Sequence, residues 1–438
     1  MSITKKTKPL MAALIASLAF AFYSCSEKTP ESAELLYDFH KKYSEAYQNE
    51  LILDSVALYV DYTTGVAMKS RIKFYWEVMR PILTSKTQSF YSIKGQDIAR
   101  EGGDVGKLLE TVSNYENPNL NAALDRIVES DREAILLTDA ELPNPSDPFM
   151  KEALTKWLLK GHDVFVIAEP YIENSVKKNL FFFIFYDSKQ EGNIGDYIKR
   201  VSKIEHFPKI TSFNLSTLPF VKGMKGGHSD PNSFVKALVN RIGDTEIQEW
   251  STGWEDKIEK YVIFTKDKKG KDLKESDILI DGLQLNANSM GGLKVTDVEM
   301  KVFNINKEYT QFYNDFKEEK PVEYEQLDFE QMNDFILMDK ASFERNSVFK
   351  LYFDRNNYDR DVLNGSPFNY FKICFYVTGV EETLDNLKDV LVFDDRLKKG
   401  YQNVSVYESI KQTIEDKQVN DFIANNPIYT IYVKALDK

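Results

Sequence analysis

Wholly apolar runs that alternate with amphipathic segments constrain the fold of this chain more than any other feature. The clearest runs are residues 134–137 and 180–186. Residues 120–128 place apolar side chains at helical spacing on one face. A strand without polar positions is buried on both faces, and helices between such strands cover those faces. Residues 55–220 therefore predict a doubly wound α/β fold with a mostly parallel sheet.

The domain organisation follows from a break in this pattern. Residues 222–233 contain three Gly and one Pro in a polar stretch, which indicates a linker or a long loop. We assign the α/β domain, with a leading helix, to residues 33–221. Residues 234–438 are dominated by short strand-like segments with aromatic residues, which predicts a β-rich, sandwich-like region of one or two modules.

The first 25 residues predict export. Three Lys precede the apolar stretch of residues 10–22, and Cys25 follows shortly after it. This order of charge, short apolar stretch and small residue is typical of a secretion signal, here residues 1–24, and the stretch is too short to span a bilayer. The segment resembles the lipobox of bacterial lipoproteins, which implies lipidation of Cys25 and a tether at residues 25–32. Ser26 after the Cys favours the outer membrane by the same resemblance.

Composition limits the partners that a protein of this kind can have. The formal net charge of the chain is −12, and 42% of its residues are hydrophobic. A negative chain is repelled by nucleic acid and by anionic lipid headgroups. We therefore expect contact with the membrane through the lipid anchor and no binding of nucleic acid.

Two acidic residues follow apolar strands directly. Asp61 ends the run at residues 56–60, and Asp139 follows Thr138 at the end of the run at residues 134–137. Ligands of open α/β sheets bind at the carboxyl ends of strands, where the strand order reverses. If the two strands are neighbours there, the carboxylates converge. Such oxygen ligands suit Mg²⁺ or Mn²⁺ better than zinc.

Three segments in order resemble the von Willebrand factor type A family. The family's metal-ion-dependent adhesion site has Asp-x-Ser-x-Ser, then Gly-Thr-Asn before a helix, then Thr-Asp-Gly after a strand. This chain has Asp61-Tyr62-Thr63-Thr64-Gly65, Asn117-Pro118-Asn119 and Thr138-Asp139-Ala140 at the matching places. The resemblance covers about 165 residues. It implies an Mg²⁺ or Mn²⁺ site whose open position binds an acidic residue of a protein partner.

The departures from the family pattern shorten the ligand set. Gly65 stands in place of the second hydroxyl residue, and Pro118 in place of the family's Thr. The residues that the resemblance carries over as ligands are Asp61, Thr63 and Asp139. Asn117 or Asn119 is the candidate for a further amide oxygen. The site is therefore expected to be a reduced version of the family's.

These observations predict a non-enzymatic, lipid-anchored envelope protein that works as a protein-interaction or adhesion module. A first alternative is a glycan-binding accessory lipoprotein in which an aromatic cluster of the C-terminal half stacks on sugar rings. The residues of this cluster are Trp250, Trp254, Tyr352, Phe353, Tyr358, Phe368, Tyr370 and Phe371. A second is a metal-dependent phosphoester hydrolase with Asp61 as nucleophile. This alternative rests on a resemblance to the haloacid-dehalogenase-like phosphatases. That family has an Asp two residues later as the proton donor, where this chain has Thr63.

Overall fold

The structure is a computed structural model of the 438-residue chain. The predicted signal peptide at residues 1–24, Cys25, the predicted tether at residues 25–32 and residues 224–233 of the predicted linker lie outside the residues that it describes. None of the helices in the described part is both long and apolar enough to cross a membrane. The described residues are Leu35, Asp38, Phe39, Lys42, Tyr43, 49–63, 72–111, 115–173, 175–190, 192–217, 221–223, 248–249, 261–265, 277–287, 290–318, 320, 329–332, 335–353, 368–394 and 401–436.

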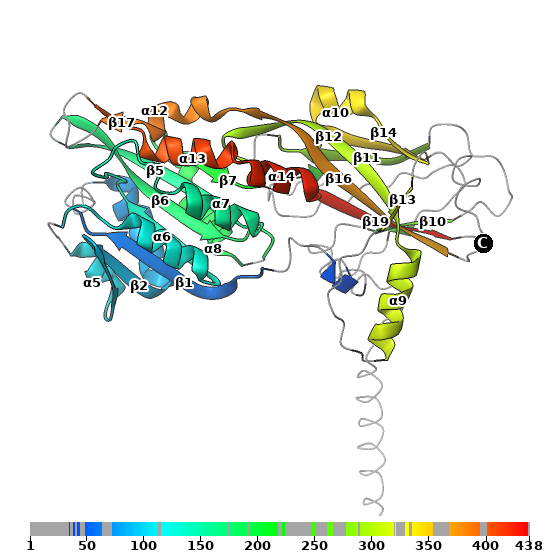
Figure 1. Ribbon diagram of the computed structural model, residues 1–438, viewed down its shortest axis with the longest axis horizontal. Coiled ribbons are helices and arrows are strands. Elements are labelled where there is room, and N and C mark those ends of the chain that lie inside the picture. The colour runs from blue at the N-terminus through cyan, green and yellow to red at the C-terminus, as the bar shows by residue number, and fades with distance from the viewer. Residues whose placement is uncertain are drawn as a thin grey trace, which may run out of the picture.

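A seven-stranded mixed sheet with helices forms one end of the molecule (Figure 1). Its strand order is β3-β2-β1-β4-β6-β5-β7. Strand β1 lies near the centre and is parallel to both of its neighbours, β2 and β4. The strands are β1 (Ile52–Asp61), β2 (Thr87–Lys94), β3 (Asp97–Glu101), β4 (Arg132–Thr138), β5 (Asp163–Glu173), β6 (Val176–Tyr186) and β7 (Thr211–Leu215).

The prediction of a mostly parallel sheet is wrong for the outer strands. Strand β6 runs antiparallel to β4 and to β5, and β7 and β3 are antiparallel to their neighbours as well. The apolar run at residues 180–186 indicates that the strand is buried on both faces. Burial does not determine whether the strand runs parallel or antiparallel to its neighbours. Only two residues separate Glu173 of β5 from Val176 of β6, and a connection of that length joins antiparallel strands only.

Helices cover both faces of this sheet, as predicted. One face packs Tyr59 of β1 and Leu136 of β4 against α6 (Leu120–Glu129) and α7 (Lys151–Leu159). The other face packs Leu58 and Ile135. Its cover consists of η3 (Tyr75–Met79), α4 (Arg80–Lys86), α5 (Val105–Glu110) and α8 (Ile194–Ser202).

The C-terminal half forms smaller, largely antiparallel sheets. The six-stranded sheet has the order β13-β12-β16-β19-β10-β9, and the four-stranded sheet has the order β14-β15-β11-β8. The two sheets touch through their cores, since the rings of Phe349 and Phe375 lie 4.5 Å apart. Their strands are β8 (Val221–Gly223), β9 (Gln248–Glu249), β10 (Tyr261–Thr265), β11 (Asp277–Leu285), β12 (Leu293–Asn304), β13 (Glu330–Met332), β14 (Ile336–Met338), β15 (Val348–Phe353), β16 (Phe368–Glu382) and β19 (Tyr429–Leu436).

The chain returns to the α/β end after β16. Short strands β17 (Phe393–Asp394) and β18 (Gln402–Asn403) pair with each other, and α13 (Ser405–Ile414) and α14 (Lys417–Asn425) pack on α7 (Figure 1). Ser409 accepts a hydrogen bond from the Met150 backbone N–H, and Lys151 pairs with Asp416 at 2.7 Å. One hydrophobic core therefore runs from the seven-stranded sheet into the C-terminal sheets.

The helical residues near the N-terminus pack on the C-terminal half. Leu35 and Phe39 share a small core with Tyr309 and Phe312 of α9 (Asn306–Lys317). The rings of Phe39 and Tyr309 meet edge to face at 5.3 Å. This segment was grouped by sequence with the α/β domain, and its apolar face instead covers α9.

Remaining helices of the described residues are short. They are η4 (Ile204–His206), α10 (Lys340–Asn346), η5 (Leu384–Leu387) and α12 (Lys388–Leu391). Asn179 of β6 donates to the Val390 carbonyl at 2.7 Å. This bond is a further tie between the seven-stranded sheet and the C-terminal half.

Candidate functional site

The carboxyl ends of β1 and β4 lie side by side at the centre of the seven-stranded sheet. Val60 is in register with Leu137, so Asp61 lies beside Thr138 and Asp139. The chain leaves β1 through α4 to reach β2 on one side, and it returns through α6 to reach β4 on the other. The order of the strands thus reverses between β1 and β4. We call this region, including Asp61, Thr63 and Asp139, the carboxyl edge.

The structure brings Asp61, Thr63 and Asp139 together in the interior of the protein. They are 0%, 2% and 1% exposed. Asp61 Oδ1 accepts the Thr63 backbone N–H at 3.0 Å, and Asp61 Oδ2 accepts the Thr138 hydroxyl at 2.8 Å. The Thr63 hydroxyl lies 3.5 Å from Asp139 Oδ2 and donates to it. The three residues are linked by these bonds into one oxygen-rich cluster.

The backbone around Asp139 is fixed by local and distant contacts. Asp139 Oδ1 accepts the Glu141 backbone N–H at 3.2 Å. Ala140 has a φ of 56°, which lies in the left-handed region that favours glycine. Its carbonyl accepts a hydrogen bond from Asn403 Nδ2 at 3.2 Å, so the C-terminal half contributes to the position of this turn.

The two Asn candidates have other roles in the structure. Asn119 Oδ1 accepts the Ala122 backbone N–H, which makes Asn119 the N-cap of α6. Asn117 is exposed with a φ of 54°, and its carbonyl accepts from Gln96. Pro118 between them is buried. The hydrogen bonds described for these Asn residues therefore organise the start of α6 and do not connect to Asp61 or Asp139.

A cation fits the donor set of the cluster. Each carboxylate has one oxygen anchored by a backbone N–H. The other oxygen accepts a threonine hydroxyl, from Thr138 at Asp61 and from Thr63 at Asp139. Hard cations such as Mg²⁺ take one or two carboxylates and keep several water molecules. Within the described residues, no group of three or more His, Cys, Asp or Glu side chains gathers as a ligand set. An ion held here would therefore rely on Asp61, Asp139, the Thr63 hydroxyl and water.

Three buried ionisable side chains at the carboxyl edge were not anticipated from the sequence. Lys178 Nζ pairs with Glu141 Oε1 at 2.8 Å, and both side chains are buried. Glu169 of β5 accepts the backbone N–H groups of Phe74 and Tyr75 at 2.7 and 2.8 Å. Burial raises the pKa of Glu169 to about 7, against the lowering effect of these two bonds. Glu169 and Lys178 are charged residues within strands β5 and β6, and their place in the sequence was the only signal.

Exposed apolar side chains surround the carboxyl edge. Tyr115 is exposed beside Thr63, with which it forms a β-bridge, and Trp76 follows the residues that Glu169 caps. Ile172, near the tip of the β5–β6 hairpin, is 78% exposed. Tyr401, two residues before Asn403, is 63% exposed. Four of the nine exposed large apolar side chains of the described residues thus lie around this edge, which we call the apolar rim.

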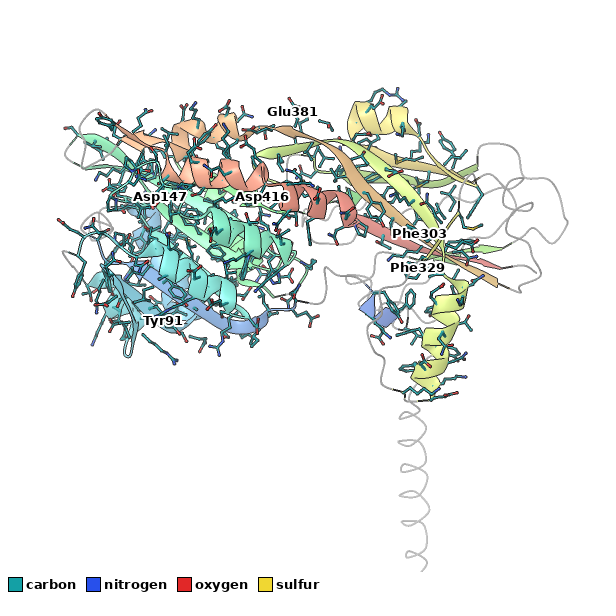
Figure 2. All side chains as sticks on the ribbon, viewed as in Figure 1. Tyr91, Asp147, Phe303, Phe329, Glu381 and Asp416 are labelled. Carbon is teal, nitrogen blue, oxygen red and sulfur yellow. The ribbon has the colours of Figure 1, made fainter. Side chains whose placement is uncertain are left out.

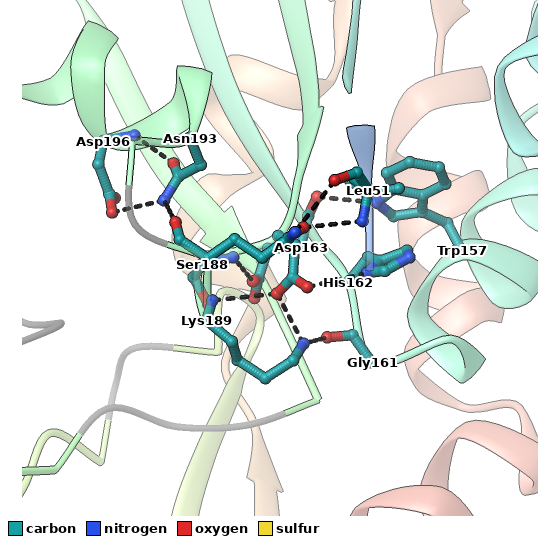
Figure 3. A network of polar contacts seen from close by, with 11 residues as sticks. Leu51, Trp157, Gly161, His162, Asp163, Ser188, Lys189, Asn193 and Asp196 are labelled. Carbon is teal, nitrogen blue, oxygen red and sulfur yellow. Dashed lines mark hydrogen bonds and ion pairs between the residues drawn. The ribbon is translucent and has the colours of Figure 1, made fainter. Parts of the chain in front are cut away.

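The opposite edge of the sheet, at the amino ends of β1, β4 and β5, carries a network of polar contacts (Figure 3). Lys189 Nζ lies 2.7 Å from Asp187 Oδ1, and His162 Nδ1 lies 3.6 Å from Asp187 Oδ2. Burial opposes ionisation of Asp187, but Lys189 and His162 outweigh it and hold the pKa of that carboxyl below its usual range. Asp163 Oδ2 accepts the Ser188 N–H, and Gln190 exchanges two hydrogen bonds with Leu51. We call this region the amino edge.

Comparison with known protein families, with curated proteins and with solved structures finds no match to this chain. The geometry of the carboxyl edge and its apolar rim is therefore the basis for assigning a function.

Proposed function

We propose that this chain is an exported lipoprotein whose α/β region binds a protein partner at the carboxyl edge. The observation that carries the proposal is the meeting of Asp61, Thr63 and Asp139 between β1 and β4. This is the place in an open α/β sheet where ligands bind. The rest of the chain holds that edge in position, since Asn403 bonds to Ala140 and α13 packs on α7.

The backbone of Ala140 supports the von Willebrand factor type A resemblance. The family has Gly after the Asp of its Thr-Asp-Gly segment, and Ala140 occupies that place with a positive φ. An L-residue pays roughly 1–2 kcal/mol in the left-handed conformation. A turn that retains the conformation without the glycine is consistent with a fold derived from that family. We assign the seven-stranded region to a variant of this fold, followed by a sandwich-like C-terminal region.

In this proposal, Asp61, Thr63 and Asp139 hold Mg²⁺ or Mn²⁺, and an acidic residue of the partner completes the coordination. The partner then approaches across the apolar rim. Aromatic side chains are enriched at protein interfaces, and the rim supplies Trp76, Tyr115 and Tyr401. The described contacts of the cluster hold its carboxylates at fixed positions, which orders these groups before a ligand binds.

The N-terminal sequence supports the proposed location. Cys25 after a Lys-rich start and a short apolar stretch is the expected lipidation site. More than one acyl chain gives stable membrane anchoring. We place the protein in the cell envelope, attached to the outer membrane, with a role in binding and not in catalysis.

Site-specific photo-crosslinking tests the proposal. A photoreactive phenylalanine analogue replaces Tyr115, Ile172 or Tyr401 in the full-length protein, which is expressed in its native envelope. We expect one discrete protein adduct at these rim positions, identified by mass spectrometry. Ile52 and Val201 are matched controls, because both are exposed apolar residues away from the carboxyl edge. Neither control position should yield that adduct.

The role of the acidic cluster is tested in the same experiment. Asp61→Asn and Asp139→Asn should each reduce the adduct at Tyr115 by about ten-fold or more, because a lost charge-assisted contact is worth at least 1.4 kcal/mol. Equal adducts at rim and control positions, or no adduct at any of them, would contradict the proposal. An adduct at the rim that both Asn variants leave unchanged would contradict the part assigned to the cluster.

A further inference from the structure

We propose that the C-terminal half contains a binding site for a neutral oligosaccharide, in a cavity between the end of β12, the start of α9 and β13. The cavity is about 640 Å³ in volume. Ligand pockets in proteins measure about 300–1,000 Å³, so the space suits a short oligosaccharide. The site is separate from the carboxyl edge and does not depend on the function proposed for that edge.

Two pairs of strand residues form one wall of the cavity. Phe303 is in register with Gln331, and Asn304 with Glu330, in the antiparallel pair of β12 and β13. Residues 306–308, which begin α9, form another wall. Figure 2 shows Phe303 and Phe329 beside the start of α9, at the end of the molecule away from Tyr91 of β2.

Aromatic rings supply the apolar part of this site. The ring centroids of Phe303 and Phe329 lie 6.3 Å apart with an angle of 55° between their planes. Both side chains line the cavity and are half-buried. The buried Lys372 places Nζ 5.2 Å from the centroid of the Phe329 ring, which helps to fix that ring. The axial hydrogens of a sugar ring offer an apolar face that packs on rings held in this way.

Polar groups of both kinds line the same cavity. Asn304 Oδ1 accepts the Asn306 backbone N–H at 3.0 Å, and Asn306 Oδ1 accepts the Tyr370 backbone N–H at 2.6 Å. These bonds orient both amides, so that the Nδ2 group of Asn304 serves as a donor. The carboxylates of Glu308 and Glu330 are acceptors on the lining. A sugar hydroxyl both donates and accepts, so it matches this mixture.

The charges of the lining favour a neutral ligand. The lining contains one cation, Lys307, and two carboxylates, Glu308 and Glu330. Lys372, which contacts the Phe329 ring, adds a second positive charge, so the formal charges of these four residues cancel. A phosphate or a nucleotide would meet two carboxylates. A fatty acyl chain would remove water from the carboxylates of Glu308 and Glu330 without replacing its hydrogen bonds, which is costly. A polyhydroxylated ring satisfies the polar groups and covers the aromatic ones.

The cavity differs from the site that the sequence suggested for glycans. Tyr370 and Phe371, which belong to the aromatic cluster of the C-terminal half, are buried in the core. Trp250 and Trp254 lie outside the described residues. The cavity instead uses two Phe residues brought together by the pairing of β12 with β13. Phe329 also contacts Phe39 at 6.3 Å, so the site lies next to the segment that follows the expected lipid anchor.

Affinity electrophoresis tests the inference. The full chain after the signal peptide is run in native gels that contain a soluble α-glucan, β-glucan, xylan or galactomannan. We expect retardation by at least one polysaccharide. Titration calorimetry with the matching oligosaccharide should then show that Phe303→Leu and Gln331→Ala each weaken binding by about ten-fold, the effect of losing one central contact.

A control on α9, whose first residues line the cavity, completes the experiment. Phe316→Leu changes an exposed aromatic residue of α9 that does not line the cavity, and it should leave binding unchanged. Gln331 is exposed, so its variant reports on the cavity even if Phe303→Leu fails to fold. No retardation by any polysaccharide, or equal binding by both cavity variants and the control, would overturn the inference. Binding of a fatty acid that requires Phe303, without sugar binding, would overturn it as well.

Discussion

Asp187 at the amino edge of the seven-stranded sheet and the pair of Asp61 and Asp139 at its carboxyl edge are stabilised in different ways. At the amino edge, Asp187 lies between the Lys189 ammonium group and the His162 imidazole. At the carboxyl edge, the hydrogen bonds described for Asp61 and Asp139 come from hydroxyl and backbone N–H groups. An opposite charge neutralises a buried carboxylate, whereas such neutral donors solvate it and leave the charge in place.

This difference separates a structural role from a binding role. The network at the amino edge connects Leu51, the turn at Gly161 and the residues after β6, and it therefore stabilises this end of the sheet. The carboxyl edge places the carboxyl groups of Asp61 and Asp139 beside an apolar rim. We therefore expect substitutions at the amino edge to change stability and substitutions at the carboxyl edge to change binding.

The largest effect is expected at the amino edge. Asp187→Ala leaves the buried His162 and the Lys189 side chain, which is only 11% exposed, without the carboxylate. Breaking a buried ion pair costs about 3–5 kcal/mol. Urea denaturation should show this loss in the free energy of unfolding. Lys73→Ala removes an exposed pair with Glu77 and should cost about 1 kcal/mol or less. A loss of under 1 kcal/mol for Asp187→Ala would remove the distinction between the two edges.

The second effect is a dependence of stability on pH. Each edge has one buried Glu whose pKa burial raises to about 7, Glu169 at the carboxyl edge and Glu133 at the amino edge. The folded state therefore holds these protons more tightly than the unfolded state. The stability that each group contributes is full below about pH 4.5 and falls as pH rises to about 7.

Comparison of the wild type with Glu169→Gln isolates this group from the other carboxylates. Their difference in the free energy of unfolding should change by about 3 kcal/mol between pH 4.5 and pH 8, since one pKa unit is worth 1.36 kcal/mol. Glu133→Gln should give a similar change. Denaturation curves across this range measure both. A difference that does not vary with pH would show that Glu169 remains solvated.

A smaller effect is expected from the turn after β4. Ala140→Gly removes the strain of a positive φ and should stabilise the protein by about 1 kcal/mol, less the entropy that glycine loses on folding. Ala153→Gly in α7 is the control and should destabilise by about 1 kcal/mol. Thermal denaturation of both variants checks the opposite signs. Destabilisation by Ala140→Gly would mean that this turn carries no strain.

The sequence predicts the centre of the sheet better than its outer strands. The apolar runs that end at Asp61 and at Thr138-Asp139 predicted strands β1 and β4. The ends of these strands meet because the strands are parallel and adjacent. The direction of β6 was missed. Its apolar residues carry no information on direction, and the signal was the two-residue separation of Glu173 and Val176.

The rest of the candidate site depends on contacts that are distant in sequence. Asn403 reaches Ala140 across 263 residues, and Glu169 reaches Phe74 across 95. Local periodicity cannot report such pairs, because each partner looks ordinary in its own segment. The same holds for the cavity, where Phe303 and Phe329 meet only after β12 and β13 have paired.

The central claim is that Asp61, Thr63 and Asp139 act as one oxygen-rich site. Titration of the full-length protein with Mn²⁺, followed by electron paramagnetic resonance, tests it most directly. We predict one bound Mn²⁺ per chain, displaced by Mg²⁺, retained in the exposed control Asp97→Asn and lost in both Asp61→Asn and Asp139→Asn, with both variants still folded. No Mn²⁺ bound to the wild type, or equal binding by all three variants, would contradict the claim.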